Sequence, residues 1–496
     1  MANEAKAAAV PQTTEQVGEK TLLDQIVETG RVGTDAATRE RGKSLVKEFI
    51  TQVLEGAVSV SKDTEAMINA RIAQIDHLLS IQLNEIMHHP TFQKLEGTWR
   101  GVKYLISQSE TSAMLKIRVM NVSKKDLLRD LQRAPEFDQS AAFKKVYEEE
   151  FGVFGGQPYG ALIGDYEFSK HPEDLELLEK MAAVAAAAHA PFISAAASQL
   201  LNMDSYTQLD QPRDIGRIFD TTEYAKWKGF RQSDDAKYVC LTCPRVLMRL
   251  PYGRDTVPVD GFNYEEGVDG TDHNKYLWGN AAYALGARMT TAFSQYNWCT
   301  AIRGVEGGGL VEGLPSHAFR TDEGDVAIKC PTEIAITDRR EKELADQGLV
   351  PLVHCKGTDK AAFFSIQSCN KPKVYDSDAA NANARLSAQL PYMMATCRFA
   401  HYLKAMMRDK IGSFLSRDDC SRFLNRWISQ YVTQDDNADQ ATKAQFPLRE
   451  ARVDVEEIKG KPGCYRAISY LRPHFQLDAI SVSLRLVANL PEPAKR

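Results

Sequence analysis

The sequence predicts an α/β protein in which mixed sheets are flanked by helices. Along most of the chain, strand-like segments of alternating or continuous apolar residues follow helical segments, a rhythm typical of α/β folds. The 496 residues, 43% hydrophobic and 26% charged, have the composition of a globular protein with about three domains of roughly 150 residues. The longest apolar tract, Met181 to Ser198, is mostly alanine and is interrupted by His189 and Pro191. We therefore expect a buried helix followed by a strand, and no membrane insertion.

Two helices are predicted near the N-terminus. Residues 1–20 lack periodicity and are predicted to be disordered. A helical stretch from Thr38 ends at Gly56, and the alternating run Ala57 to Ser61 is an isolated strand-like segment. The next helix spans Glu65 to Met87, where apolar residues recur three and four positions apart along one face: Ile68, Ile72, Ile75, Leu79, Leu83 and Ile86.

The adjacent histidines His88 and His89 stand at the end of this helix. Pro90 disfavours helical geometry at His89 and ends the helix. Apolar residues spaced three and four positions apart, among them Trp99, then predict a second helix. Two helical metal ligands normally lie four residues apart, whereas neighbouring residues point about 100° apart. We therefore favour a capped helix end, with a buried Trp99 and Gly101 as structural residues, over a metal or catalytic site.

Further strands and helices alternate in the middle of the chain. Ser123 is expected to cap a helix that starts at Lys124. Period-two or continuous apolar runs predict strands at Met114–Val122, Tyr159–Phe168, Pro191–Ser198, Lys237–Pro244 and Glu333–Asp338. The polar, turn-rich stretch from Lys371 to Asn383 is a candidate boundary, and a helical block follows from Ala384 to Val432.

Charge and cysteine usage restrict the partners. The chain has 61 basic and 66 acidic residues and a formal net charge of -5, so it lacks the positive field needed to hold a nucleic acid. The N-terminus has no secretory signal, which favours the cytoplasm. All nine cysteines follow residue 239 at irregular spacing, as expected of reduced thiols in a reducing compartment.

No local motif predicts a catalytic residue, a cofactor or a metal. Cys240 and Cys243 form a C-x-x-C without a second pair, so buried structural thiols are favoured over a zinc or redox site. The acidic run lacks the EF-hand ligand order, and a solvated loop is favoured: Asp255, Asp260, Glu265, Glu266, Asp269 and Asp272.

The glycine-rich stretch from Ile302 to Pro315 lacks the ending of a P-loop. A positive φ or a close approach of the backbone explains Gly307, Gly308 and Gly309 more simply. The alternative function is a cytoplasmic α/β nucleotide-binding enzyme that uses this loop.

The most informative segment is the last one. In Ile480–Val487, apolar residues alternate with Ser and Arg, which predicts a half-buried strand. With Cys464–Leu471 it is expected to form a hairpin connected by Pro473–Asp478. A lone hairpin is marginal in water and its edges are open. Another part of the chain or another molecule must complete the sheet, and the pattern alone leaves both open.

Several long motifs resemble one known family. They are "HPTFQKLEGTWRGVKYLI", "AIRGVEGGGLVEGLP", "SRFLNRWISQYV" and the stretch from "AQFPLREARVDVEEI" to "ISVSLRLVANLP". From about residue 20 to the C-terminus, the chain is similar to the large subunit of the type VI secretion contractile sheath, the TssC/VipB/EvpB family. The resemblance implies a contractile tail-sheath-like fold and an assembly protein without catalytic activity.

The resemblance also implies partners. The large subunit pairs with a small sheath subunit of the TssB/VipA type, and neighbouring copies form a helical cylinder around an Hcp inner tube. The sheath meets a baseplate and contracts, and a ClpV-type ATPase recycles it mainly through the small subunit. The C-terminal hairpin would accept strands from other subunits, and its expected inter-subunit residues are Tyr465, Ala467, Ser469, Leu471, Ile480, Val482, Leu484 and Leu486.

The same resemblance suggests an organisation in three parts. Residues 1–60 form a flexible arm with an inter-subunit strand, 61–378 the α/β sheath body with its outer domain, and 379–496 the C-terminal core domain. Asp454, Glu456 and Glu457 are candidates to face the tube.

Overall fold

The computed structural model describes residues 36–54, 64–321, 324–413, 416–435, 437–458, 465–474 and 476. The chain divides into two compact units, Met1–Ser80 and Ile81–Arg496. Within the described part of the chain, no helix combines the length and the apolar character needed to cross a bilayer.

The first unit contains α2 (Ala36–Leu54) and most of α3 (Thr64–Met87). Both predicted helices are therefore confirmed. The apolar face predicted for α3 is present but exposed, with Ile72 at 50%. The predicted strand Ala57–Ser61 lies outside the described residues.

The second unit is built on a six-stranded mixed sheet with the order β1-β2-β3-β9-β10-β6. Strands β1, β2, β3 and β9 are parallel, and β10 runs antiparallel to both of its neighbours, β9 and β6. The α/β class predicted from the sequence is thereby confirmed. The strands are β1 (Leu162–Phe168), β2 (Phe192–Ala196), β3 (Val239–Cys243), β9 (Leu349–His354), β10 (Ala361–Phe363) and β6 (Leu310–Val311).

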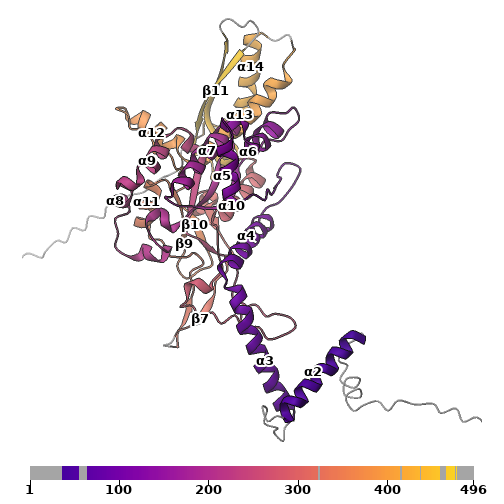
Figure 1. Cartoon of the computed structure of the whole chain (residues 1–496). Coiled ribbons are helices and arrows are strands. Elements are labelled where there is room, and N and C mark those ends of the chain that lie inside the picture. The colour runs from indigo at the N-terminus through magenta and orange to yellow at the C-terminus, as the bar shows by residue number, and fades with distance from the viewer. Residues whose placement is uncertain are drawn as a thin grey trace, which may run out of the picture. The chain divides into compact units, whose positions relative to one another are not determined.

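Helices cover both faces of this sheet (Figure 1). Val239 and Leu241 of β3 belong to one buried cluster, whereas Cys240 between them belongs to a second cluster on the opposite face. This alternation follows from the two-residue period of a strand. The first face carries α5 (Lys124–Arg133), α7 (Pro172–Ala188) and α9 (Ala225–Gln232), and the second carries α10 (Ala282–Tyr296).

Local sequence signals fix several helix ends. Ser123 Oγ accepts a hydrogen bond from Asp126 N at 3.1 Å, which confirms the predicted cap of α5. His189 ends α7 in the left-handed region with a φ of 51°. Pro90 occupies the first turn of α4 (Pro90–Ser107), where its missing N–H costs nothing.

Trp99 is not buried, and this prediction was wrong. Its side chain is 63% exposed, because the buried stripe of α4 consists of Gly97, Gly101 and Leu105. A Cβ at Gly101 would collide with the ring of Tyr283 on α10. The small residues, rather than the tryptophan, allow the close approach of α4 to α10.

Two predicted strands do not form. The described structure has no strand at Met114–Val122 or at Glu333–Asp338. Ile334 and Ile336 are buried in the core as parts of an irregular segment. An apolar pattern with a period of two residues indicates that side chains are buried alternately. A β-strand also requires hydrogen bonds to the backbone of a neighbouring strand.

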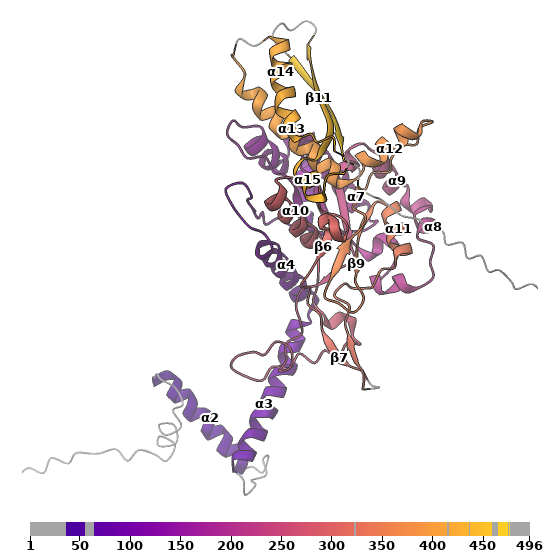
Figure 2. The ribbon, with the colours of Figure 1, turned by 180° about the vertical axis from the view of Figure 1, so that it is seen from behind.

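The remaining elements are short or C-terminal. Figure 2 shows α13 and α14 beside β11, which matches the predicted helical block. The remaining α-helices and strands are α6 (Ala141–Phe143), α8 (Ile215–Phe219), α11 (Asp338–Asp346), α12 (Asp378–Ser387), α13 (Leu390–Asp409), α14 (Arg417–Ile428), α15 (Gln440–Gln445), β4 (Val246–Leu247), β5 (Trp278–Gly279), β7 (Ala318–Arg320), β8 (Val326–Ile328), β11 (Leu448–Glu457) and β12 (Tyr465–Pro473).

Candidate assembly interfaces

The C-terminal strand β12 pairs with β11 in an antiparallel ladder from Leu448 opposite Pro473 to Glu457 opposite Tyr465. β11 is a strand that was not predicted, although buried Val453 and Val455 alternate with polar residues there. The predicted partner strand lies outside the described residues, and with it Ile480, Val482, Leu484 and Leu486. Among the described residues, β12 has β11 as its sole neighbour.

The four described inter-subunit candidates share one face of β12. Tyr465, Ala467, Ser469 and Leu471 alternate along the strand and lie on the same face as Val453 and Val455. Tyr465 and Leu471 pack against the cluster that contains Leu424 of α14, whereas Ala467 and Ser469 are exposed. The sheet is therefore covered at its two ends and uncovered in the middle of β12.

The outer edge of β11 is occupied at two positions, at Leu448 by a hydrogen bond of 2.9 Å from Thr433 N and at Val453 by a side chain. Asn425 of α14 donates from Nδ2 to Val453 O at 2.7 Å, and its Oδ1 accepts from Val453 N at 2.9 Å. The amide thus uses the two backbone groups that a further strand would need at this position. In the described structure, the sheet can grow at the β12 edge.

The candidate tube-facing acids lie along β11. Asp454 is half-buried and accepts from Arg452 Nη2 at 2.7 Å, whereas Glu456 and Glu457 are exposed near the end of the strand. Asp454 and Glu456 lie on the face opposite to the buried valines. Arg452 and Arg466 share that face, so the surface is of mixed charge rather than purely acidic.

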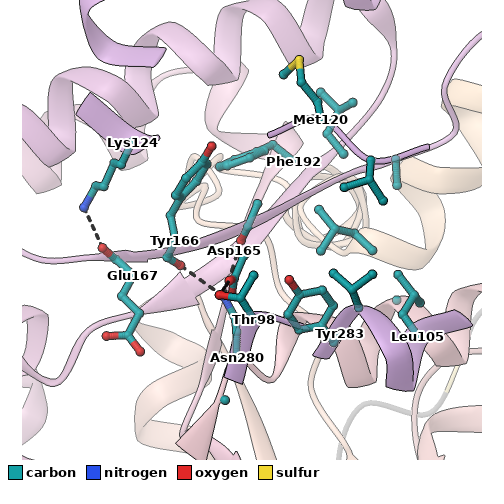
Figure 3. A pocket seen from close by; sticks show the side chains of 18 of the residues that line it. Thr98, Leu105, Met120, Lys124, Asp165, Tyr166, Glu167, Phe192, Asn280 and Tyr283 are labelled. Atoms are coloured by element: carbon teal, nitrogen blue, oxygen red, sulfur yellow. Dashed lines mark hydrogen bonds between the residues drawn. The ribbon is translucent and has the colours of Figure 1, made fainter. Parts of the chain in front are cut away.

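A second feature is a large hollow beside β1, which we call the β1 groove. It has a volume of about 2540 Å³ and is lined by β1, α4, α10 and the irregular segment 114–122. Figure 3 shows Asp165, Tyr166 and Glu167 of β1 between Lys124 on one side and Thr98 and Tyr283 on the other. Most of β1 is only half-buried, because no described strand covers its outer edge.

Polar groups in the β1 groove are held by their neighbours. Burial raises the pKa of the Asp165 carboxyl, and a hydrogen bond donated by Thr98 Oγ1 acts in the opposite direction. Burial also raises the pKa of Tyr166 to about 12, and its hydroxyl donates to Val122 O at 2.9 Å. These contacts position backbone segments and leave no activated nucleophile at Asp165 or Tyr166.

The glycine-rich loop is a packed turn. Gly304 N donates to Phe363 O at 2.7 Å and Gly309 N donates to Gly304 O at 2.8 Å, so neither N–H is free for a phosphate. Gly308 has a φ of 89°, and a Cβ at Gly309 would lie 2.7 Å from Phe363 O. Gly307 has an ordinary φ of -92° and open space around it, so the structure gives no reason for a glycine there. The geometry does not support the nucleotide-binding alternative.

The two histidines before Pro90 have separate structural contacts. His89 Nδ1 accepts from Thr91 N at 3.3 Å as the cap of α4. His88 Nε2 lies 3.2 Å from Glu266 Oε1, and Glu266 is bound by Arg249 at 2.6 Å. Glu266 is thus buried, which corrects the expectation of a wholly solvated acidic loop. The described residues contain no cluster of three or more His, Cys, Asp or Glu side chains able to hold a metal.

Cys240 and Cys243 lie in the buried strand β3 as free thiols. Burial raises the pKa of Cys240 well above its ordinary value and that of Cys243 to about 12, so both stay protonated. The structural interpretation of this C-x-x-C is consistent with their burial in the core.

Comparison with known proteins assigns the family. The EvpB/VC_A0108 tail sheath N-terminal domain model matches residues 69–370, and the EvpB/VC_A0108 tail sheath gpW/gp25-like domain model matches residues 379–490. The chain belongs to the EvpB/VC_A0108 tail sheath family. Its sequence is 51% identical over 482 residues to the type VI secretion system sheath protein TssC1 of Pseudomonas aeruginosa, covering 97% of this chain and 96% of that protein. The suspected family is thereby confirmed, and the chain is a sheath protein.

Solved structures give a weaker similarity to this tail sheath chain. A chain of the anti-feeding prophage baseplate has a TM-score of 0.38 at 9% identity, covering 75% of this chain and 83% of that chain. A chain of the anti-feeding prophage sheath in the contracted state has a TM-score of 0.32 at 9% identity, covering 76% and 99%. Family membership follows from the sequence matches.

Proposed function

We propose that this tail sheath protein is the large subunit that pairs with a small sheath subunit of the TssB/VipA type. The heterodimers polymerise into a helical cylinder around an Hcp inner tube, and contraction propels the tube and its effectors. The observation that carries the proposal is the C-terminal sheet, in which Asn425 occupies the β11 edge at Val453 while no described strand lies along the β12 edge.

An open sheet edge is a means of joining subunits. Each added strand of about five residues forms about five backbone hydrogen bonds at roughly 0.5–1.5 kcal/mol each, before side-chain burial. One joint is modest, but a lattice in which every subunit gives and receives a strand is strong. A heterologous contact that does not close generates a helix rather than a ring.

The proposal assigns roles to three parts of the chain. Residues 1–60 act as an arm that donates a strand, 61–378 form the body, and 379–496 form the domain that receives strands. Within the last part, Ile480–Val487 continues the sheet beyond β12, and Asp454, Glu456 and Glu457 face the tube. The junction between the two matching family models, after residue 370 and before residue 379, supports the second boundary.

The remaining partners belong to the same proposal. The assembled sheath contacts a baseplate, and a ClpV-type ATPase recycles it mainly through the small subunit. The chain acts in the cytoplasm as a structural protein without catalytic activity or cofactor.

Electron microscopy after co-expression with the small subunit tests this function. Tubes with a helical lattice are expected, and they should shorten and widen on contraction. Monodisperse particles that never form tubes would contradict the proposal.

A further inference from the structure

We propose that Cys330 is a site of reversible oxidative modification, at which a hydroperoxide and then a small thiol react with a thiolate held by His354. Neither residue belongs to the C-terminal sheet or lines the β1 groove. No step of the proposed sheath function uses this pair. The inference therefore goes beyond that function and does not depend on it.

Two segments distant in the sequence bring Cys330 and His354 together. Cys330 lies between β8 and Pro331, whose carbonyl oxygen accepts from Leu247 N of β4 at 2.8 Å. His354 is the last residue of β9, where it stands opposite Ala361 of β10. The two side chains are hydrogen-bonded to each other. Both are half-buried, so a small reagent can reach the sulfur.

The ring of His354 is oriented through its other nitrogen. Nε2 lies 2.8 Å from Thr358 O, in the turn between β9 and β10. A carbonyl oxygen can only accept, so Nε2 carries a proton and Nδ1 is the nitrogen left for Cys330. A nucleophile beside a base that a third group orients is the arrangement of an activated thiol. The thiol proton can pass to Nδ1, which leaves a thiolate beside an imidazolium.

This contact changes the ionisation of both groups. Burial acts to raise the pKa of the Cys330 thiol, but hydrogen bonds to His354 and Thr332 outweigh it, and the pKa is lowered. The hydrogen bond with Cys330 raises the pKa of His354, against the effect of burial. Where burial dominates, as at Cys299 and Cys369, it raises the pKa of the thiol to about 12. Cys330 thus differs from the inert thiols of the core.

Thr332 is the weaker of the two donors to the sulfur. Its Oγ1 lies 3.1 Å from Cys330 Sγ and 2.8 Å from Ile334 O. One hydroxyl proton cannot serve both acceptors fully, so His354 is the main positioning residue. A metal site is not indicated, because the described part of the chain brings no third His, Cys, Asp or Glu side chain to this pair.

The proposed reaction has two steps and two co-reactants. The thiolate attacks the terminal oxygen of a hydroperoxide, so an S–O bond forms and the O–O bond breaks. The leaving oxyanion takes the proton from the His354 imidazolium and departs as an alcohol or as water. The sulfur is thereby oxidised to a sulfenic acid, and the peroxide is reduced. A small thiol then attacks this sulfur, an S–S bond forms and water leaves, which gives a mixed disulfide that further thiol can reduce.

Alkylation of the full chain by iodoacetamide, followed by mass spectrometry, tests the activated thiol. The exposed Cys355 is the internal reference. From pH 8 to pH 6, the ratio of the Cys330 rate to the Cys355 rate should rise at least about tenfold, because the thiolate fraction of an unassisted thiol falls about tenfold per pH unit. His354→Gln keeps a donor for Thr358 O but cannot take the thiol proton, and should make this ratio independent of pH. A ratio that stays constant in the parent would overturn the proposal.

Two controls separate this chemistry from unfolding. His77→Gln, at an exposed position of α3, should keep the pH dependence of the parent. Cys240 is completely buried, so its alkylation reports loss of the core. Unfolding would expose Cys330 and speed its alkylation, whereas the proposal predicts slower alkylation at pH 6 in His354→Gln. The pH dependence of the parent decides the matter even where His354→Gln exposes Cys240.

Hydrogen peroxide added with dimedone, which captures sulfenic acids, tests the oxidation itself. At pH 7, labelling of Cys330 should exceed that of Cys355 at least about fivefold, and it should fall at least about fivefold in His354→Gln. Glutathione in place of dimedone should give a mixed disulfide at Cys330 that dithiothreitol removes. Preferential labelling of Cys355, or unchanged labelling of Cys330 in the variant, would overturn the proposal and leave the sheath function standing.

Discussion

Asn425 binds both backbone groups of Val453, so one residue of α14 occupies the strand position next to β11. Edge strands invite unwanted pairing unless something covers them. This contact blocks the β11 edge at Val453, whereas no described strand lies along the β12 edge. In the proposed polymer, strands from neighbouring subunits would therefore add along the β12 edge.

Replacing Asn425 should destabilise the C-terminal domain. Asn425→Leu keeps the approximate size of the side chain but leaves Val453 N without a partner and Val453 O with only the long 3.5 Å contact from Ser421 Oγ, which costs about 1–3 kcal/mol. Urea unfolding followed by tryptophan fluorescence measures this loss. Asn383→Leu, at an exposed position of α12, is the control and should change little. A stable Asn425→Leu variant would mean that β11 needs no edge closure.

Charge reversal on β11 tests the tube-facing role. Replacing Asp454, Glu456 and Glu457 by lysine should reduce co-assembly with tube protein while pairing with the small subunit persists, because the proposed function places that pairing at the β12 edge. Pull-down with each partner separates the two. Reversal of exposed Asp255 and Asp260 is the control. Undiminished co-assembly of the triple variant would remove these acids from the tube interface.

Deletion of residues 1–60 tests the donated arm. We expect folded heterodimer but no long sheaths, because each subunit would receive strands without giving one. Sedimentation measures formation of the heterodimer, and electron microscopy shows whether long sheaths form. Deletion of residues 1–20 alone should still allow sheaths, since it spares the alternating run Ala57–Ser61. Normal contractile sheaths from the longer deletion would refute the arm.

Two glycines should respond in opposite ways to alanine. Gly101→Ala places a Cβ against the ring of Tyr283, and such overpacking costs about 1–3 kcal/mol. Gly229, inside α9, has nothing within 4 Å of an added Cβ, so Gly229→Ala should stabilise by about 0.4–1 kcal/mol. Thermal unfolding compares both with the parent. A thermal midpoint of Gly101→Ala equal to that of the parent would show that α4 and α10 can shift apart without cost.

His401 should make the fold sensitive to acid. Its Nε2 lies 2.9 Å from Ala188 O, and burial lowers its pKa to about 4, against about 6.5 in an unfolded chain. The unfolded state therefore binds more protons between pH 6.5 and 4. Stability is complete above pH 6.5 and falls as the pH falls through this window, by about 3 kcal/mol in all.

His401→Gln is the test of this pH dependence. The glutamine keeps a donor for Ala188 O but does not titrate. Urea midpoints at pH 7 and pH 5 should differ less in the variant than in the parent. The comparison isolates His401 from His189, whose pKa burial also lowers. Identical pH slopes would show that His401 titrates normally.

The sequence alone predicted the features that local patterns encode. The helix α3, the break at Pro90, the Ser123 cap and the existence of strands β1 to β3 follow from spacing, capping chemistry and apolar runs. The family follows from long motifs and is confirmed by the matches over most of the chain. Spacing, capping residues and motifs can be read from the sequence without knowing the tertiary contacts of the chain.

Only the tertiary structure decided which side of each element is used. Alternation in Met114–Val122 predicted a strand, but a ladder requires a neighbouring backbone that the described chain does not place there. Trp99 is exposed because Gly97 and Gly101 form the face of α4 that packs against its neighbours. Strand β12 pairs with β11, and side chains of both strands pack against α14. Local sequence sets the conformation that a segment can adopt, whereas its partners are set by contacts between residues distant in the chain, and these depend on the whole fold.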